Sequence, residues 1–189
     1  MSIFLEYLKE HQDLMSNLTN LNDDVTKASN YLINSIKSGN KILVCGNGGS
    51  ASDAQHFASE LTGRFIDDRK PLPAISLATD SSALTCISND YSFDYVFSRQ
   101  IEAIGKEGDC LVCISTSGNS QNLIEAAKVA FKKNIKCIGL LGKGGGPLNE
   151  FCNFSIIIPS NTTARIQEAH IIIYHSICRQ IEVELDLIK

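Results

Sequence analysis

The sequence predicts an α/β fold: a doubly wound, five-stranded parallel sheet flanked by helices, with an N-terminal helical arm and a long C-terminal helix. Short β-rich runs alternate with helical stretches from residue 40 onward, as in an open α/β sheet. These runs are almost wholly apolar rather than alternating, which is typical of parallel strands covered on both faces. We therefore expect a single domain over residues 1–189, with an arm at 1–38 and an α/β core at 40–189.

The N-terminal arm is expected to be helical, because apolar residues recur every three, four or seven positions through residues 2–38. Gly39 ends the segment. This spacing indicates two helices or one bent helix. The glycine-rich segment KGGGP, which follows the fourth expected strand, is predicted to be a loop. The strands are expected at 41–46, 73–78, 109–115, 136–142 and 154–160, and the core helices at 50–62, 81–104, 120–133 and 163–188.

Composition excludes several classes of protein. The 43% hydrophobic and 20% charged content is ordinary for a globular domain, and a net charge of −4 gives no sign of nucleic-acid binding. The N-terminus lacks the pattern of a signal peptide, and no apolar run approaches the length of a membrane span. We therefore expect a cytoplasmic protein with no nucleic-acid and no membrane partner.

The seven cysteines are odd in number, irregular in spacing and mostly set in apolar runs, which predicts reduced, buried thiols. Cys110 and Cys113 have the spacing of a metal or redox pair. On a strand, however, residues three apart point to opposite faces, which favours two core cysteines.

A glycine-rich turn, GNGGS at 46–50, follows the first strand and opens a helix. Glycine permits close backbone approach, and free amides at a helix start attract anions. The spacing overlaps the dinucleotide-binding fingerprint, but Asp67 and Asp68 precede the second strand instead of following it. No P-loop lysine follows the glycines either, so dinucleotide binding is disfavoured.

A second candidate, STSGNS at 115–120, follows the third strand and opens the next helix. Ser115, Thr116, Ser117 and Ser120 place four hydroxyl groups beside helix-start amides. Helix capping needs only one such hydroxyl, so a phosphate-binding loop is the better interpretation.

His56 and Glu60 are four residues apart on one helix and therefore share a face. They can bind one metal or act as an acid and base, although such a pair is more often a surface contact. The last helix adds Gln167, His170 and His175. Spacing alone does not choose among them, because Gln167 and His175 are separated by about 12 Å along the axis.

Asn89 and Asp90 lie in the segment SND, predicted to be a loop between helical pieces. Their side chains suit hydrogen bonds to sugar hydroxyls, and helix capping is an equal alternative.

Taken in order, the segments GNGGSASDAQHFASELTGRF, SND, ISTSGNS and ARIQEAHIIIYH resemble the phosphoheptose isomerase family, whose members have the sugar-isomerase (SIS) fold. The likeness runs from about residue 40 to 180. The family's more usual GGSAADAQH has alanine where this chain has Ser52.

The resemblance implies conversion of sedoheptulose 7-phosphate to D-glycero-D-manno-heptose 7-phosphate through a cis-enediol, the first step toward nucleotide-activated heptose for bacterial lipopolysaccharide or capsule. It also implies one zinc ion per subunit and a homotetramer with active sites at subunit interfaces, so that the last helix need not come from the same subunit. Glu60 and His175 would be catalytic. The implied zinc ligands are His56, Glu60, Gln167 and His175; the implied substrate contacts are Asn47, Gly48, Gly49, Ser50, Glu60, Asn89, Asp90, Ser115, Thr116, Ser117, Ser120 and Gln167.

Two other hypotheses about function stay open. SIS-fold proteins that bind the bacterial replication initiator resemble this chain, but they lack counterparts of Glu60 and His175. Another phosphosugar isomerase or sensing module is the second alternative, and the ordered HFASE and QEAHIIIYH segments argue against it.

Overall fold

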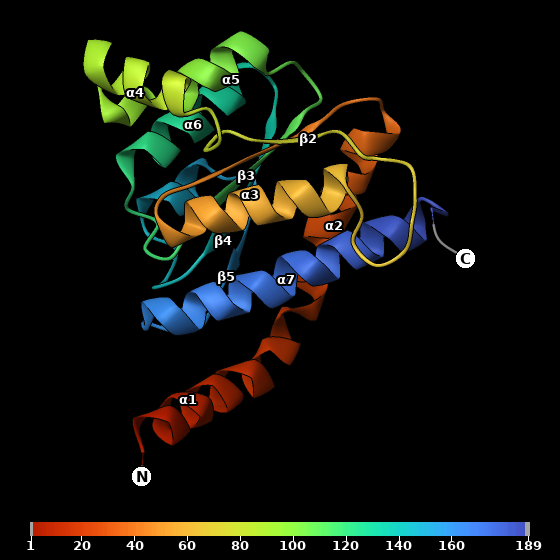
Figure 1. The fold of residues 1–189 in the computed structure, drawn as a ribbon, viewed down its shortest axis with the longest axis vertical. Helices are drawn as coiled ribbons and strands as arrows, with labels where there is room; N and C mark the ends of the chain where they lie inside the picture. Colours follow the sequence, from red (N-terminus) through yellow and green to blue (C-terminus); the bar gives the residue numbers. More distant parts are fainter. Residues whose placement is uncertain (1, 188–189) are drawn as a thin grey trace.

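The N-terminal arm is two helices. The structure, a computed structural model, describes residues 2–187. Helix α1 (Ile3–Asn17) is joined by a short 3-10 turn to α2 (Asn22–Lys37), so the arm has two helices rather than one bent helix. The Ser2 hydroxyl accepts a hydrogen bond from the backbone of Leu5 and caps α1. Only Leu14 of α1 is buried, and Figure 1 shows α1 projecting from the body.

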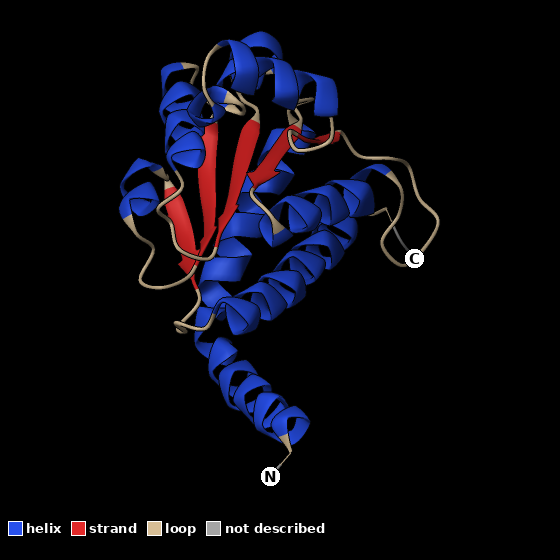
Figure 2. Cartoon of the chain, turned by 60° about the vertical axis from the view of Figure 1, so that its left-hand side comes forward, coloured by secondary structure: helices blue, strands red, loops and turns tan. Residues whose placement is uncertain are grey.

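The core is a five-stranded parallel sheet, as predicted, with strand order β2-β1-β3-β4-β5. Figure 2 shows the strands, in red, with helices packed around them. The strands are β1 (Ile42–Gly46), β2 (Ala74–Ser76), β3 (Cys110–Ser115), β4 (Lys136–Leu141) and β5 (Phe154–Ile157). All residues of β1 and β3 are buried, which explains their uninterrupted apolar sequence.

Helices cover both faces of the sheet. One face packs against α2, α3 (Gly49–Thr62) and α7 (Thr163–Glu184). The other packs against α4 (Ser81–Asp90), α5 (Ser98–Ile104) and α6 (Gln121–Lys132). Each face has its own cluster of buried side chains, so the core is in two layers, as expected for a doubly wound fold.

The order of the strands reverses between β1 and β3. From β1 the chain goes outward to β2 and then returns past β1 to β3. Gly46, which ends β1, is paired in register with Ile114 near the end of β3. The turns that leave these two strands are therefore neighbours, at the place where open α/β sheets bind ligands.

The helical stretch expected over 81–104 is in fact three pieces: α4, a 3-10 turn at Phe93–Tyr95, and α5. Asp80 caps α4 through Ala83, and Ser92 caps the next turn through Asp94. Asp80 therefore begins α4, whereas Ser92 binds the backbone locally where the helical stretch is interrupted. Asn89 and Asp90 are the last residues of α4, so the prediction that they lie in a loop was wrong.

All seven cysteines are free thiols, and five of them are buried in the core; Cys152 is partly buried and Cys86 is exposed, so the predicted burial does not extend to Cys86. Cys110 and Cys113 belong to the clusters on opposite faces of the sheet, as the spacing predicted. Burial raises the pKa of Cys110 to about 12. The hydrogen bond with Cys137 lowers the pKa of Cys113, but the hydrogen bond with Cys45 and burial together outweigh it, so that this pKa is raised well above its usual range. Protonated, enclosed thiols are inert, so these residues serve packing. Among residues 2–187, no helix is both long enough and apolar enough to span a bilayer.

Candidate active site

Two helices bring three ligand-type side chains together. His56 and Glu60 come from α3 and His175 comes from α7, and one ligating atom from each lies within 4.8 Å of the others. His56 Nε2 lies 2.9 Å from Glu60 Oε1, and the rings of His56 and His175 are 5.0 Å apart. We call these three residues the His-Glu-His cluster.

The cluster forms within one chain because α3 and α7 run side by side and parallel, as Figure 1 shows. Gln167, near the start of α7, lies against Gly49 at the start of α3, and His175 lies beside His56 further along. Phe57 stacks on Tyr174 at 5.4 Å and fixes this register from the core side. The same subunit therefore brings its last helix to His56 and Glu60.

Tyr174 orients the His56 ring. Its hydroxyl lies 2.9 Å from His56 Nδ1, on the side of the ring away from Glu60. Burial, together with the charges of Asp53 and Glu60, raises the pKa of Tyr174, so the hydroxyl stays protonated and can donate. With Nδ1 engaged by Tyr174, Nε2 is the atom that His56 presents to the cluster.

His175 offers an unused nitrogen. Its Nε2 is buried and has no hydrogen-bond partner among the residues described. Burial and the nearby His56 lower the pKa of His175, which keeps the imidazole neutral. Two imidazoles and one carboxylate are the donor set of many catalytic zinc sites, so the residues present fit that metal.

Asp53 and Tyr174 surround the cluster, and sequence reasoning did not single them out. Asp53 is buried one turn before His56, and burial raises its pKa to about 6. Its Oδ2 has no hydrogen-bond partner within residues 2–187. In the sequence both residues look like ordinary members of amphipathic helices, so only packing reveals their position.

The other two α7 residues that the sequence offered as candidates, Gln167 and His170, have different surroundings. Gln167 packs so closely on Gly49 that a Cβ at that glycine would overlap its amide nitrogen. Gly49 precedes His56 by seven residues, about 10 Å along the helix, so the Gln167 amide lies near the start of α3 in this structure. His170 is buried against Leu141, and burial lowers its pKa to about 4. It therefore faces the sheet and is not available as a ligand.

The hydroxyl-rich loop at 115–120 leaves the end of β3. Ser115 Oγ accepts from the Gly118 amide at 3.0 Å, and Ser117 Oγ accepts from the Asn119 amide at 3.3 Å. Ser120 is the first residue before α6, but its side chain makes no capping hydrogen bond. The helix-start amides thus stay open to a ligand, as a phosphate-binding loop requires.

The glycine-rich loop at 143–147 packs against the hydroxyl-rich loop at 115–120. A Cβ on Gly118, whose φ is +64°, would collide with the carbonyl of Gly145. Leu148, in the 3-10 turn Pro147–Phe151, donates its amide to Gly118 O at 3.0 Å. The sequence predicted only a loop at KGGGP; the structure shows that this loop holds 115–120 in place.

The turn after β1 is tied to the same region. The side-chain amides of Asn47 and Asn122 exchange two hydrogen bonds of 2.9 Å, which join this turn to the first turn of α6. Gly48 has a positive φ of 55° and Ser50 is buried. The side chain of Asn47 is therefore occupied by Asn122, and the exposed backbone of Gly48 and Gly49 remains open to a ligand.

Asn89 and Asp90 are exposed at the end of α4. Asn89 donates to the Asp90 carboxylate at 2.8 Å, and Cys86 Sγ lies 3.4 Å from the same carboxylate. None of these hydrogen bonds links them to the loop at 115–120 or to the His-Glu-His cluster.

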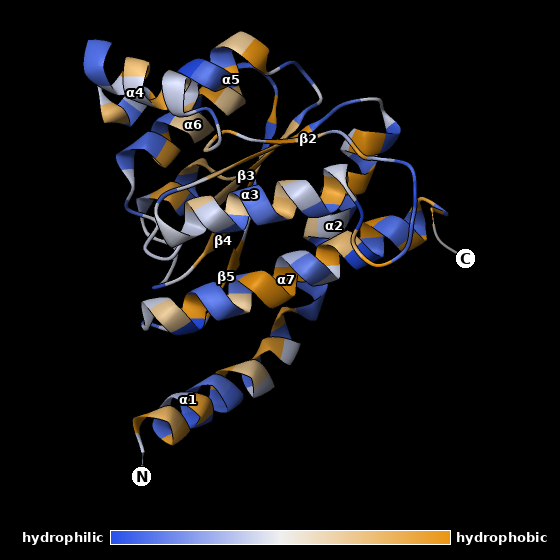
Figure 3. Cartoon of the chain, in the orientation of Figure 1, coloured by the Kyte–Doolittle hydropathy of each residue, from blue (hydrophilic) through white to orange (hydrophobic). Residues whose placement is uncertain are grey.

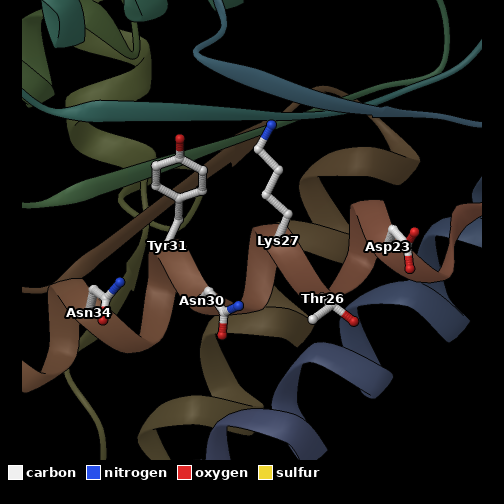
Figure 4. Close-up of a pocket in the computed structure, with 6 residues that line it drawn as sticks. All are labelled: Asp23, Thr26, Lys27, Asn30, Tyr31 and Asn34. Carbon is white, nitrogen blue, oxygen red and sulfur yellow. The ribbon is translucent and has the colours of Figure 1, made fainter.

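A surface hollow along α2 lies away from these groups. Figure 4 shows Lys27 and Tyr31 pointing toward the sheet, with Lys27 Nζ 4.4 Å from the centre of the Phe154 ring. Phe154 begins β5, so this part of the hollow lies at the amino end of a strand. Ligands of open α/β sheets bind at the carboxyl ends, and we therefore assign no function to this hollow.

Comparison with known proteins agrees with the motifs. The SIS domain family matches residues 6–142. Phosphoheptose isomerase of Campylobacter concisus is 54% identical over 175 residues, 93% of each chain, and that of Aliarcobacter butzleri is 51% identical over 184 residues, 97% of each. The solved phosphoheptose isomerase of Neisseria gonorrhoeae superimposes with a TM-score of 0.91 at 42% identity, covering 95% of this chain and 97% of that one.

These likenesses extend over nearly the whole chain and include both helices of the His-Glu-His cluster. The relatives are isomerases by name, and the SIS fold predicted from the motifs is confirmed. The chain is therefore an isomerase that belongs to the phosphoheptose isomerase family of SIS-domain proteins.

Proposed function

We propose that the protein converts sedoheptulose 7-phosphate to D-glycero-D-manno-heptose 7-phosphate in the bacterial cytoplasm. This reaction would be the first step toward nucleotide-activated heptose for lipopolysaccharide or capsule. The observation that carries the proposal is the meeting of His56, Glu60 and His175 within 4.8 Å, in a fold whose hydroxyl-rich loop suits a phosphate. The printed names of the relatives, phosphoheptose isomerase, support the class of substrate.

The chemistry needs a base and an acid. In a ketose, a base removes a proton from the hydroxyl-bearing carbon beside the carbonyl, while an acid protonates the carbonyl oxygen. The resulting cis-enediol becomes the aldose when the proton returns to the neighbouring carbon and the hydroxyl group on the first carbon gives up its proton to the conjugate base of the acid. Glu60 is proposed to carry this proton, and His175 to serve as its acid partner.

Zinc is proposed as the cofactor, one ion per subunit, held by His56, Glu60 and His175. When bound, it would polarise the sugar carbonyl and stabilise the negative charge on the enediol oxygens. Gln167 was expected both as a ligand and as a substrate contact; its place beside Gly49 favours the contact with sugar. The kcat and the zinc content of Glu60→Gln distinguish whether Glu60 acts as base, as ligand or as both.

The phosphate is proposed to bind at Ser115, Thr116, Ser117 and Ser120. Binding energy from this remote group would position the reacting end of the sugar. The backbone of Gly48 and Gly49, with Ser50, Asn89 and Asp90, is proposed to contact the sugar chain. Asn47 would contribute through its backbone, because its side chain is bound to Asn122.

A homotetramer with interface sites is also proposed. His56 and Glu60 lie about 10 and 16 Å along α3 from the glycine turn, so a second subunit can bring a phosphate loop nearer to the cluster. Figure 3 shows hydrophobic colour along α1, where several large apolar side chains are exposed and suited to a contact between copies. They are Ile3, Phe4, Leu5, Tyr7 and Leu8.

The direct test is an assay of the purified protein with sedoheptulose 7-phosphate and, in parallel, six-carbon ketose phosphates. The proposal expects turnover of the seven-carbon sugar. Preference for a six-carbon sugar would indicate a different phosphosugar isomerase. Absence of turnover with every sugar in the presence of zinc would favour a non-catalytic SIS protein.

Removing the Ser117 hydroxyl should weaken substrate binding. In Ser117→Ala we expect a KM for the phosphosugar raised about 5- to 20-fold, because a hydrogen bond to a charged group contributes about 1.5 kcal/mol. Steady-state kinetics measures the change. Ser160→Ala, a serine in the loop after β5, is the control. An unchanged KM in Ser117→Ala would count against residues 115–120 as the phosphate loop.

Removing the Tyr174 hydroxyl should loosen the His56 ring. Tyr174→Phe keeps the stacking on Phe57 but deletes the 2.9 Å contact with Nδ1. Loss of such an orienting partner typically lowers metal affinity about 10- to 100-fold. Competition with a chromophoric chelator measures the affinity. Tyr31→Phe is a control outside the cluster, and wild-type affinity in Tyr174→Phe would show that Tyr174 does not orient His56.

A further inference from the structure

A buried ion pair lies beyond the cluster, at the far ends of α3 and α7. Arg69 Nε donates to Glu182 Oε1 at 2.8 Å, and both side chains are fully buried, with exposed fractions of 0%. Arg69 belongs to the irregular segment 63–73 between α3 and β2, drawn in yellow beside the end of α7 in Figure 1. Glu182 lies in the last turn of α7.

Arg69 closes the C-terminal end of α3. Its guanidinium donates to the backbone carbonyls of Glu60 at 2.6 Å and Leu61 at 2.8 Å. The same group also reaches the carbonyls of Gly63 and Lys70. The last carbonyls of a helix lack partners within the helix, and a positive charge there complements the helix dipole. One arginine thus fixes the turn that carries the Glu60 carboxylate.

Glu182 joins that turn to α7. Besides Arg69, its carboxylate accepts from the Phe65 amide at 3.3 Å, and Arg179 lies 3.7 Å from its second oxygen. Glu182 follows His175 by seven residues, about two helical turns, so the two residues lie on the same side of α7. The pair therefore holds the α7 face that carries His175 against the α3 turn that carries Glu60.

Stability alone does not account for a fully buried ion pair. Removing two charges from water is costly, and apolar residues of similar size often stabilise as well or better. What an apolar pair cannot reproduce is the fixed geometry of a planar guanidinium with several partners. That geometry matters here because a misplacement of about 1 Å is enough to impair a catalytic group.

We propose that Arg69 and Glu182 are positioning residues: they set the register of α7 along α3 and so hold His175 at the correct place beside His56 and Glu60. The inference rests on the proposed metal site and assigns no contact with substrate to either residue. It extends the site's support to the segment 63–73, in which Arg69 binds the backbone carbonyl of Glu60 and the Phe65 ring lies 5.2 Å from the His175 ring.

The test replaces the pair by apolar residues in Arg69→Met/Glu182→Leu, which leaves no unpaired buried charge. The matched control replaces both members of another ion pair, Lys41→Met/Asp109→Leu, whose Lys41 Nζ lies 2.6 Å from Asp109 Oδ2 at the start of β1 and β3. We expect zinc affinity in Arg69→Met/Glu182→Leu to fall about 10-fold or more and kcat to fall with KM unchanged. Lys41→Met/Asp109→Leu should retain the wild-type zinc affinity, kcat and KM.

Two further measurements keep the outcome decisive. If Arg69→Met/Glu182→Leu does not fold, Arg69→Lys keeps the charge but offers fewer donors, and it should show the same loss. A crystal structure of the folded variant should show the His56 and His175 rings moved from their 5.0 Å separation. Wild-type zinc affinity, kcat and ring separation in a folded variant would overturn the proposal. If the unaltered protein binds no zinc, the metal proposal fails, and the ring separation still tests Arg69 and Glu182.

Discussion

Glu60→Gln is expected to lower kcat for the heptose phosphate about 10²- to 10⁴-fold, the usual contribution of a general base. Glutamine has nearly the same shape as glutamate but cannot accept the proton from carbon. The fold should be retained, because the Glu60 side chain lies at the partly exposed edge of α3. The measurement is kcat at saturating substrate and saturating zinc.

The metal content of the same variant separates the roles of Glu60. Zinc retained with kcat lost would identify Glu60 as the base, and loss of both would make it a ligand as well. Glu125→Gln is the matched control, because Glu125 also lies on a helix and also pairs with a neighbour, Lys128, at 2.9 Å. Wild-type kcat in metal-loaded Glu60→Gln would refute the assignment of the proton transfer to this residue.

Removal of metal is expected to have an effect of similar size. Treatment with a strong chelator, followed by its removal, should reduce turnover at least 10²-fold, and stoichiometric zinc should restore it, because the ion would stabilise the developing negative charge. His175→Ala should bind zinc at least 10-fold more weakly, since it removes one of three donors.

His11→Ala provides the control for that variant. His11 pairs with Glu168 at 2.8 Å on the surface between α1 and α7, away from the cluster. It should keep both zinc and activity. Full turnover by protein shown to be free of metal would contradict the zinc proposal and leave Glu60 and His175 as an acid and base pair without a metal.

Much of the fold could be predicted because the signals are local. The apolar runs that became β1 and β3 are buried on both sides, so their sequences differ clearly from those of the helices around them. The prediction of one helical stretch over 81–104 was less accurate, since the breaks near Tyr91 and Phe97 depend on side chains such as Ser92 that bind the backbone.

The candidate site was predictable to the extent that it lies in continuous motifs. His56 and Glu60 share a helix face at a spacing of four, and the loop at 115–120 follows a strand. Spacing gave no reason to choose His175 over His170. The structure separates them, because His170 is packed on Leu141 in the core whereas His175 turns to His56.

The sequence by itself determined the class of sheet, the positions of the two turns proposed to bind the substrate, and the family, because each of these is encoded by neighbouring residues. Tertiary structure alone decided that α7 runs parallel to α3 and supplies His175 within the same chain, and that Gln167 lies against Gly49. It also placed Tyr174, Arg69 and Glu182. The physical reason is that helix register is set by packing and buried charge between distant segments, which no local pattern records.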